Sequence, residues 1–157
     1  MKFSKIEIHN FKQYYSSISI DLETTKDKNI IVIGGRNGYG KTNFLLSIVW
    51  CLFGEKISLI DDNFRKEIQK EKNYSSFMQQ SINWRAKKEN RTKFSVCVNI
   101  SDIELPELRI LNSNTNSIII KRTFDIATMN EDLSILDAES NFEIFNLEGD
   151  KINFIND

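Results

Sequence analysis

A glycine-rich stretch between an apolar run and a helical apolar pattern constrains this chain more than any other feature. The run Ile30–Ile33 leads to Gly35, and four residues later comes Gly40-Lys41-Thr42, which completes the Walker A pattern G-x-x-x-x-G-K-[ST]. This pattern requires a buried strand before it and a helix after it. Apolar residues at helical spacing continue from Lys41 to about Phe53. The sequence therefore predicts a phosphate-binding loop between a buried strand and a buried helix.

The residue types of this loop suit a phosphate chain. Glycines at 35, 38 and 40 let backbone N–H groups approach a ligand closely and allow positive φ angles. The helix that opens near Lys41 adds its unpaired first-turn N–H groups and the positive end of its dipole. Lys41 is predicted to reach the β- and γ-phosphates, and the Thr42 hydroxyl is predicted to coordinate Mg²⁺. We therefore expect a Mg-nucleotide site.

Composition narrows the classes of protein that remain. A chain of 157 residues with 40% apolar residues is one domain in size and can bury a core. Its two cysteines, Cys51 and Cys97, lie in apolar segments without metal-ligand spacing, which predicts reduced core residues and a cytoplasmic protein. We expect neither a transmembrane helix nor a signal peptide. The net charge of −1 argues against strong DNA binding by this piece alone.

The periodicity along the chain indicates the order of its elements. Alternation over Phe3–His9 predicts a strand with Ile6 and Ile8 inward, and a second strand covers 18–22. After Gly54 ends the long helix, two helices are predicted, from about Phe64 to Lys72 and from Tyr74 to Asn83. From Arg91 onward the period is two, and strands are expected over 94–100, 108–111, 117–126 and 142–147.

Two further segments invite a functional interpretation. Trp84–Lys93 is a basic run with an aromatic residue, which suits either contact with DNA phosphates or a solvated connection between a helix and a strand. Ser134–Glu139 has a faint likeness to a Walker B strand. It lacks the four apolar residues and the adjacent acids of that motif, so a turn is predicted there. His9, the single histidine, is assigned to a strand end without a catalytic role.

The subtype of the loop carries a family resemblance. Asn37-Gly38-Tyr39-Gly40-Lys41-Thr42 near the N-terminus, after a strand ending in Asn10-Phe11-Lys12, resembles the ABC-type ATPases of chromosome maintenance and repair, the SMC class. Within that class the chain is most similar to the DndD family of bacterial DNA phosphorothioate modification. The segments that carry this second likeness are 37–42, 51–54, 74–77, 82–83, 94–100, 118–124 and 152–157.

The resemblance implies an α/β fold. It would be the N-terminal lobe of a P-loop NTPase of ABC/SMC type, with a mixed sheet around the Walker A helix and an added antiparallel β-sheet. The implied single lobe spans 1–157. It comprises strands, P-loop and helix (1–54), a helical insertion (55–90), antiparallel strands (91–148) and a tail (149–157) before a missing Q-loop and coiled coil. The signature motif and Walker B are expected in a C-terminal lobe absent from this chain.

The resemblance also implies a site, cofactors and partners. The cofactors are ATP and Mg²⁺, with Lys41 catalytic and Thr42 the metal ligand. The implied cofactor-binding residues are Lys12, Gly35, Arg36, Asn37, Gly38, Tyr39, Gly40, Lys41, Thr42 and Asn43. The implied partners are the chain's own C-terminal lobe, a second head in a homodimer, other DNA-modification or repair proteins, and DNA through the assembled complex, with no membrane.

Three alternatives to DNA phosphorothioate modification or defence stay open at this level. One is the head lobe of an SMC-class ATPase for DNA double-strand-break repair. Another is a stand-alone nucleotide-binding regulatory domain without catalysis. The third is an enzyme of a different P-loop family, such as a nucleotide kinase, which would need a substrate lid and a second acidic site. In the favoured interpretation the isolated lobe binds ATP but barely hydrolyses it, because hydrolysis requires the missing lobe and head dimerisation.

Overall fold

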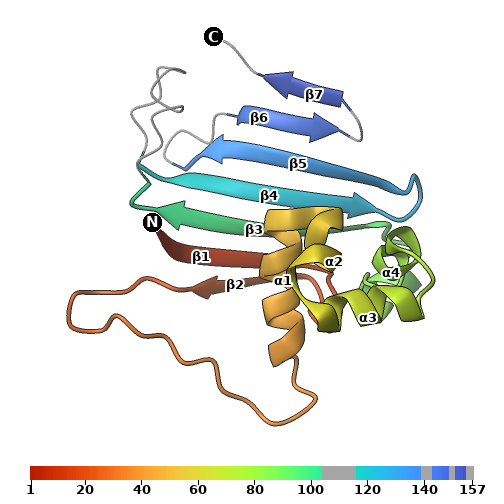
Figure 1. Cartoon of the computed structure of the whole chain (residues 1–157), viewed down its shortest axis with the longest axis horizontal. Coiled ribbons are helices and arrows are strands. Elements are labelled where there is room, and N and C mark those ends of the chain that lie inside the picture. The colour runs from red at the N-terminus through yellow and green to blue at the C-terminus, as the bar shows by residue number, and fades with distance from the viewer. Residues whose placement is uncertain (104–115, 139–142, 149–150, 155–157) are drawn as a thin grey trace.

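A single antiparallel sheet forms the frame of the molecule. The computed structural model describes residues 1–103, 116–138, 143–148 and 151–154. Within this part the strands pair in the order β2-β1-β3-β4-β5-β6-β7 (Figure 1). Their bounds are β1 Lys2–His9, β2 Ser17–Asp21, β3 Lys93–Ser101, β4 Ile118–Asp125, β5 Asn130–Asp137, β6 Glu143–Glu148 and β7 Lys151–Phe154. The N-terminal strand therefore lies inside the sheet, between β2 and β3.

The helices cover one face of this sheet. Five α-helices and one 3-10 turn are present in the described residues between β2 and β3; in Figure 1, α1 and α2 lie in front of the sheet, and α3 and α4 lie toward one end of it. Their bounds are α1 Lys41–Phe53, η1 Gly54–Lys56, α2 Ile57–Ile60, α3 Asp62–Lys70, α4 Tyr74–Gln79 and α5 Trp84–Lys88. The helix α1 contacts β3 and β4 directly. The fold is thus α/β with one covered sheet face.

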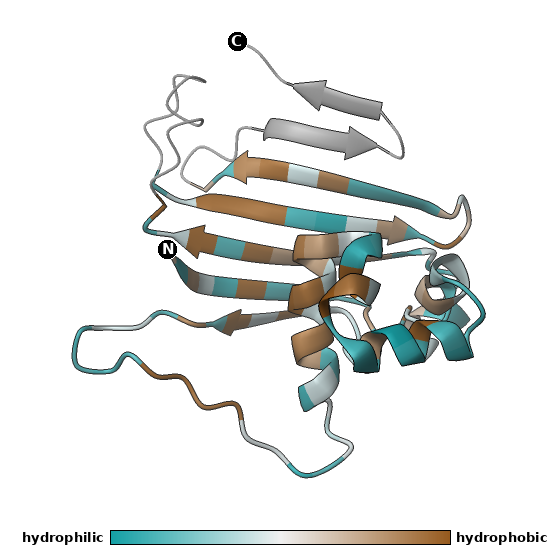
Figure 2. Cartoon of the chain, in the orientation of Figure 1, coloured by the Kyte–Doolittle hydropathy of each residue, from teal (hydrophilic) through white to brown (hydrophobic). Residues whose placement is uncertain are grey.

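Strict alternation of side chains explains why the sheet has a buried and a polar face. In β1, Ile6 and Ile8 are fully buried, while Glu7 between them is half-buried. In β3, Phe94 and Val96 are likewise buried, and their neighbours point to the other face. A sheet with one solvated face requires this pattern. The resulting alternation of hydrophilic and hydrophobic residues is visible along the strands in Figure 2.

Stacked aromatic rings fix the central helix to the sheet. Trp50 of α1 is fully buried, and its ring lies parallel to that of Phe11, with 5.5 Å between ring centroids. Phe94 of β3 lies 5.3 Å from Trp50 and 5.6 Å from Phe124 of β4. Aromatic contacts of this kind add to the burial energy of each ring. The phenylalanine of the Asn10-Phe11-Lys12 motif is therefore a core residue that anchors α1.

The continuous helical stretch Lys41–Ile60, which comprises α1, η1 and α2, is long and apolar enough to cross a membrane by length and composition. In the fold, however, Phe44, Leu46 and Trp50 of this stretch are buried in the core shared with the sheet. The regular α-helix also ends at Phe53, where Gly54 takes a positive φ of 54°. The stretch is therefore the core helix of a folded domain.

Burial controls the chemistry of the two cysteines, both of which are free thiols. Cys51 is fully buried, and its Sγ lies 3.3 Å from the carbonyl oxygens of Val96 and Ile120. This burial raises the pKa of the Cys51 thiol to about 12, and burial also raises the pKa of Cys97. Both side chains are thus protonated thiols near neutral pH. The prediction of a core residue is confirmed for Cys51, whereas Cys97 is half-buried on the other face of β3.

We expect the Cys51 thiol to resist alkylation in the native protein. In a Cys97→Ser variant, iodoacetamide at pH 8 should label Cys51 at least about 100-fold more slowly than in the urea-unfolded chain, because only the thiolate reacts. The sign for stability follows from the same raised pKa. Because the folded state holds the proton more tightly, stability should fall as the pH rises above the unfolded value of about 8.5. Mass spectrometry of the labelled chain measures the rates, and equal rates in both states would contradict the burial of this thiol.

The buried strand expected before the phosphate loop is not present. Ile30–Ile33 forms no strand, and its side chains are exposed, with Ile30 at 80% and Val32 at 86%. All strand pairings among the described residues are antiparallel, so the expected mixed sheet around the Walker A helix is wrong for this part of the chain. The physical reason is that no described strand lies beside this run, and a lone β segment cannot satisfy its backbone groups.

The second half of the chain brings smaller corrections. Ser134–Asp137, expected as part of a turn, belongs to strand β5, whose residues pair with β4 from end to end. The strands expected over 117–126 and 142–147 are present as β4 and β6. The segment 151–154, expected in the tail, pairs with β6 as strand β7. The strand expected over 108–111 lies outside the described residues.

Candidate nucleotide-binding site

The Walker A residues form an exposed loop that ends in the start of α1. Gly38 and Gly40 have φ angles of 84° and 95°, a region that non-glycine residues rarely adopt. The backbone N–H of Tyr39 donates to the carbonyl of Arg36 at 3.3 Å, which closes a turn around Asn37 and Gly38. The prediction of glycines at positions of positive φ is therefore confirmed at two of the three glycines.

Lys41 folds back over the loop that precedes it. Its Nζ donates to the carbonyl oxygens of Gly35 at 2.6 Å and Arg36 at 3.0 Å. Both partners are neutral backbone acceptors. None of the ion pairs among the described residues involves Lys41. The amine is therefore positioned inside the loop with its positive charge uncompensated, ready to exchange carbonyl oxygens for a charged acceptor such as a phosphate.

The first turn of α1 offers further donors. Gly40 is the N-cap, no side chain caps this end of the helix, and the first turn carries no acidic residue. Thr42 lies in this first turn and is exposed. Unpaired N–H groups and the positive end of the helix dipole therefore point toward the loop, where they favour an anion.

Two residues that follow the Asn10-Phe11-Lys12 motif hold the loop in place. The hydroxyl of Tyr14 donates to the Gly40 carbonyl at 3.2 Å, and Asn43 Nδ2 donates to Gln13 Oε1 at 2.5 Å. A Cβ on Gly40 would lie only 1.4 Å from Gln13 Nε2, so the glutamine amide covers this glycine. The sequence did not identify Gln13 and Tyr14 as residues of the site, because their position after the motif is the only feature that distinguishes them.

A small hollow opens beside Lys41. It has a volume of about 200 Å³ and is lined by Tyr14, Ile20, Ile33, Gly34, Tyr39, Lys41 and Phe44. Its walls are mostly apolar, and the lysine is the one cationic residue among its lining residues. The hollow therefore joins strand β2, the phosphate loop and the start of α1 around a single positive charge.

Lys12, also predicted to contact the nucleotide, instead has its side chain over the Phe77 ring. Its Nζ lies 4.4 Å from the centroid of the Phe77 ring in a cation–π contact. Burial lowers the pKa of Lys12, while the carboxylates of Glu67 and Glu71 oppose that effect. Its backbone φ is 50°, and its N–H and carbonyl are both hydrogen-bonded, to Ser81 and Asn83. In this structure Lys12 thus fastens the turn after β1 to α4, and its neighbours Gln13 and Tyr14 contact the loop.

The donor set around the loop fits a magnesium ion carried by phosphates. Among the described residues no group of three or more His, Cys, Asp or Glu side chains is placed to hold a metal ion. Mg²⁺ bound with a nucleotide needs few protein ligands, because phosphate oxygens and water fill most of its octahedral shell. A single hydroxyl, that of Thr42, would suffice as the protein ligand here.

A buried charge cluster lies at the opposite end of α1. Arg122 of β4 forms an ion pair with Glu131 of β5 and donates from Nε to the Cys51 carbonyl at 3.0 Å. The Tyr74 hydroxyl donates to Glu131, and Trp50 Nε1 donates to Tyr74 at 2.8 Å. Burial, then the charge of Glu131, raises the pKa of Tyr74. This cluster lies roughly three turns, about 15 Å, along α1 from Lys41, so Glu131 cannot act on a nucleotide there.

Comparison with known proteins agrees with the geometry of the loop. A family model described as an AAA domain matches residues 5–156. The match covers almost the whole chain, including the phosphate loop, α1 and the sheet. No curated protein matches the chain.

Proposed function

Because the chain belongs to the AAA domain family of P-loop ATPases, we propose that it is the ATP-binding lobe of an SMC-like, ABC-type ATPase that acts in DNA metabolism. The observation that carries this proposal is Lys41, whose amine lies inside a glycine loop at the uncapped start of a buried helix. Such loops bind the phosphates of nucleotides. DNA phosphorothioate modification in the cytoplasm is the pathway we favour, and its support is the sequence resemblance described above.

The proposed binding step is an exchange of partners at Lys41. On binding, the amine leaves the carbonyl oxygens of Gly35 and Arg36 and moves to the β- and γ-phosphates of ATP. The N–H groups of the first turn of α1 would hold the same phosphates, and Thr42 would provide a ligand for Mg²⁺. Mg²⁺ supplies charge neutralisation of the phosphates when bound. Gln13 and Tyr14 keep Gly40 in the conformation that this step requires.

The exposed apolar residues near the loop support a partner lobe. All four residues of Ile30–Ile33 are more than 40% exposed, and Leu45, in the first half of α1, is 54% exposed. Exposed apolar surface of this kind on a monomer marks an interaction site. We propose that a C-terminal lobe of the same protein covers this patch and pairs with Ile30–Ile33. Two such heads would then form a homodimer that works on DNA with other DNA-modification or repair proteins.

The proposed lobe binds ATP but barely hydrolyses it. Lys41 is in none of the ion pairs of the described residues, and the Glu131 carboxylate is engaged with Arg122 at the far end of α1. A general base for water is therefore expected from the C-terminal lobe, and the charge-stabilising signature motif from the second head. Both would complete the site only in the assembled protein.

We expect Lys41→Ala to weaken Mg-ATP binding by about 10- to 100-fold. A charge-assisted hydrogen bond contributes about 1.5–3 kcal/mol, which corresponds to that range of affinity. Isothermal titration calorimetry of the 157-residue chain measures the effect, and circular dichroism checks that the variant is folded. Lys66→Ala, which removes an exposed lysine from α3, is the matched control and should bind as the parent chain does. Binding that does not depend on Lys41 would refute the nucleotide site.

A phosphate-release assay tests the hydrolysis part of the proposal separately. The isolated chain should release phosphate from ATP at a rate close to that of buffer. Robust turnover that disappears in Lys41→Ala would show that the chain already contains a complete active site, and would remove the need for a second lobe.

A further inference from the structure

A second charged surface lies away from the phosphate loop. Residues 84–93, here called the basic segment, comprise α5 and the connection to β3. They carry five basic side chains and one acidic one in a chain whose net charge is −1. Their charge is therefore opposite in sign to that of the rest of the molecule and concentrated in one place. A local positive surface of this kind attracts polyanions.

The basic segment is held rigidly by its N-cap. Asn83 is buried, and its Oδ1 accepts hydrogen bonds from the N–H groups of Arg85 at 3.0 Å and Ala86 at 3.4 Å. Its own N–H donates to the Asn10 carbonyl at 2.7 Å, and its Nδ2 donates to the Lys12 carbonyl at 2.8 Å. Ala86 is the one buried residue of α5, so the charged side chains project outward from a fixed backbone.

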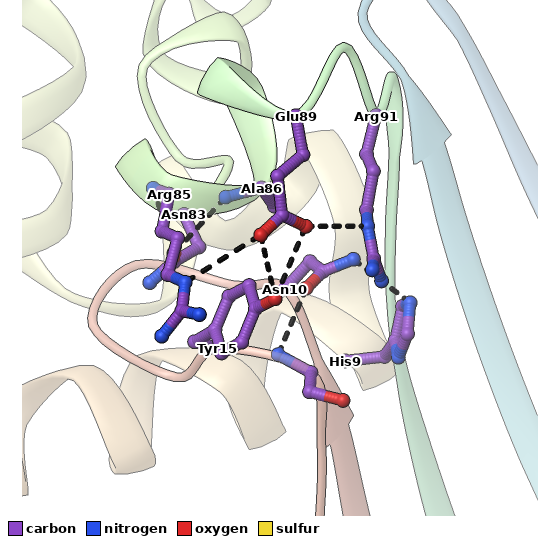
Figure 3. A network of polar contacts seen from close by, with 9 residues as sticks. His9, Asn10, Tyr15, Asn83, Arg85, Ala86, Glu89 and Arg91 are labelled. Atoms are coloured by element: carbon purple, nitrogen blue, oxygen red, sulfur yellow. Dashed lines mark hydrogen bonds and ion pairs between the residues drawn. The ribbon is translucent and has the colours of Figure 1, made fainter.

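Three donors converge on one carboxylate within this segment, as Figure 3 shows. The hydroxyl of Tyr15 donates to both oxygens of Glu89, at 2.8 and 3.0 Å. Arg91 Nε lies 3.0 Å and Arg85 Nε 3.5 Å from the same carboxylate, and both guanidinium groups lie over the Tyr15 ring. Two arginines and a hydroxyl around one exposed anion form an arrangement that fits a phosphate group equally well.

An exposed aromatic ring lies at the start of the segment. Trp84 is 66% exposed, and Lys88 Nζ lies 5.0 Å from its ring centroid. An exposed tryptophan ring beside cations forms a stacking platform for a nucleobase. Burial, then the charges of Arg91 and of Lys121 on β4, lower the pKa of the nearby His9.

From these contacts we propose that the basic segment binds a single strand of nucleic acid. Trp84 stacks on a base, Lys87 and Lys88 contact backbone phosphates, and a further phosphate replaces the Glu89 carboxylate between Arg85 and Arg91. The exposed tryptophan favours nucleic acid over an acidic peptide, which offers no ring to stack on. This inference goes beyond the proposed ATP site and does not depend on it. Since the net charge of the chain is negative, the expected dissociation constant at 50 mM salt is about 10⁻⁵ M.

The two tryptophans provide a direct test. Trp84 is exposed and Trp50 is fully buried, so quenching of tryptophan fluorescence by a single-stranded 12-mer oligonucleotide reports on Trp84 alone. The parent chain should show saturable quenching. In Trp84→Phe the remaining Trp50 signal should not change, while fluorescence anisotropy of a labelled oligonucleotide should show binding about 5-fold weaker.

Charge-neutral variants test the phosphate contacts. Lys87→Gln/Lys88→Gln should weaken binding by about 5- to 10-fold and reduce the slope of log K against log salt by about 1.4 for a single strand. Lys66→Gln/Lys70→Gln, with the same loss of charge on α3, is the control and should bind as the parent does. Glu89→Gln keeps an acceptor for Tyr15 but frees both arginines from a negative charge, so it should tighten binding by about 3- to 10-fold.

Results of three kinds would overturn the inference. The first is quenching that persists in Trp84→Phe, or equal weakening by the control and test lysine pairs. The second is an equal affinity for a polyglutamate peptide, which would identify an acidic protein segment as the partner. The third is loss of oligonucleotide binding in Lys41→Ala, which would place the strand's phosphates in the Walker A loop. Retained oligonucleotide binding in that variant, with ATP binding lost, separates this site from the nucleotide site.

Discussion

Glu131→Ala is expected to lower the free energy of unfolding by about 3–5 kcal/mol, the cost of leaving a buried charge without its partner. The Arg122 side chain is 7% exposed, and Glu131 is its ion-pair partner. Without Glu131, the Cys51 carbonyl would be the remaining hydrogen-bond partner of the guanidinium among the described residues. The Tyr74 hydroxyl would also lose its acceptor. Equilibrium unfolding in urea, followed by circular dichroism, measures the change.

Two companion variants separate charge from packing in this cluster. Glu131→Gln retains oxygen and nitrogen atoms at the same positions, so it should cost less than the alanine variant. Arg122→Met/Glu131→Leu removes both charges together and should recover most of the lost stability, because a buried ion pair can be replaced by apolar residues of similar volume. A double variant less stable than Glu131→Ala would mean that the two side chains do more than neutralise each other.

The same cluster explains why glycine stands at position 54, where the sequence pattern predicts only the end of the helix. A Cβ on Gly54 would lie 2.6 Å from both Arg122 Nη1 and Glu131 Oε1. Because the Arg122 side chain is only 7% exposed, its guanidinium has little room to move away. Gly54 therefore ends α1 and also allows the ion pair to pack against the helix backbone.

Trp50→Ala is expected to destabilise the fold by a similar amount, about 3–5 kcal/mol. The indole is fully buried, stacks on Phe11 and contacts Phe94, so its removal leaves a cavity between α1 and the sheet. It also removes the donor to the Tyr74 hydroxyl. Urea unfolding again provides the measurement, with the same protein concentration and buffer for each variant.

One control for this prediction changes another residue of α1, and the second replaces Trp50 itself by a smaller ring. Leu45→Ala changes a residue of α1 that is 54% exposed and should alter stability by no more than about 0.5 kcal/mol. Trp50→Phe retains the stacked ring but loses the hydrogen bond, so it should fall between the two. If Trp50→Ala and Leu45→Ala had equal effects, α1 would not be anchored through its indole.

Local patterns in the sequence determined several parts of this structure. The alternation in β1 identified a strand with the correct inward residues, and the period of two also located β3 and β4, because a half-buried strand imposes that period on a sequence. Asp61 and Asn73, as N-caps of α3 and α4, mark the helix starts near the predicted positions. The glycine and lysine positions of the Walker A loop were recognisable because they are adjacent in sequence, whereas the strand expected before the loop is absent.

Contacts between distant residues could not be predicted in this way. How the elements pack in three dimensions decides several contacts. They are the ion pair of Arg122 with Glu131, the hydrogen bonds of Gln13 with Asn43 and of Tyr14 with Gly40, and the position of Lys12 over Phe77. The apolar run Ile30–Ile33 also shows that a local pattern does not suffice to predict a strand. Its composition predicts a buried strand, but a strand exists only where a neighbouring strand accepts its hydrogen bonds.

The sequence by itself determined the residues of the phosphate loop, the helix behind it and the strands β1 to β4 and β6, because each depends on residues that are close together in the chain. The tertiary structure decided which charges are paired, which apolar residues remain uncovered and which side chains hold the loop. Those properties depend on burial and on distances between segments far apart in sequence, and a local pattern carries no information about either.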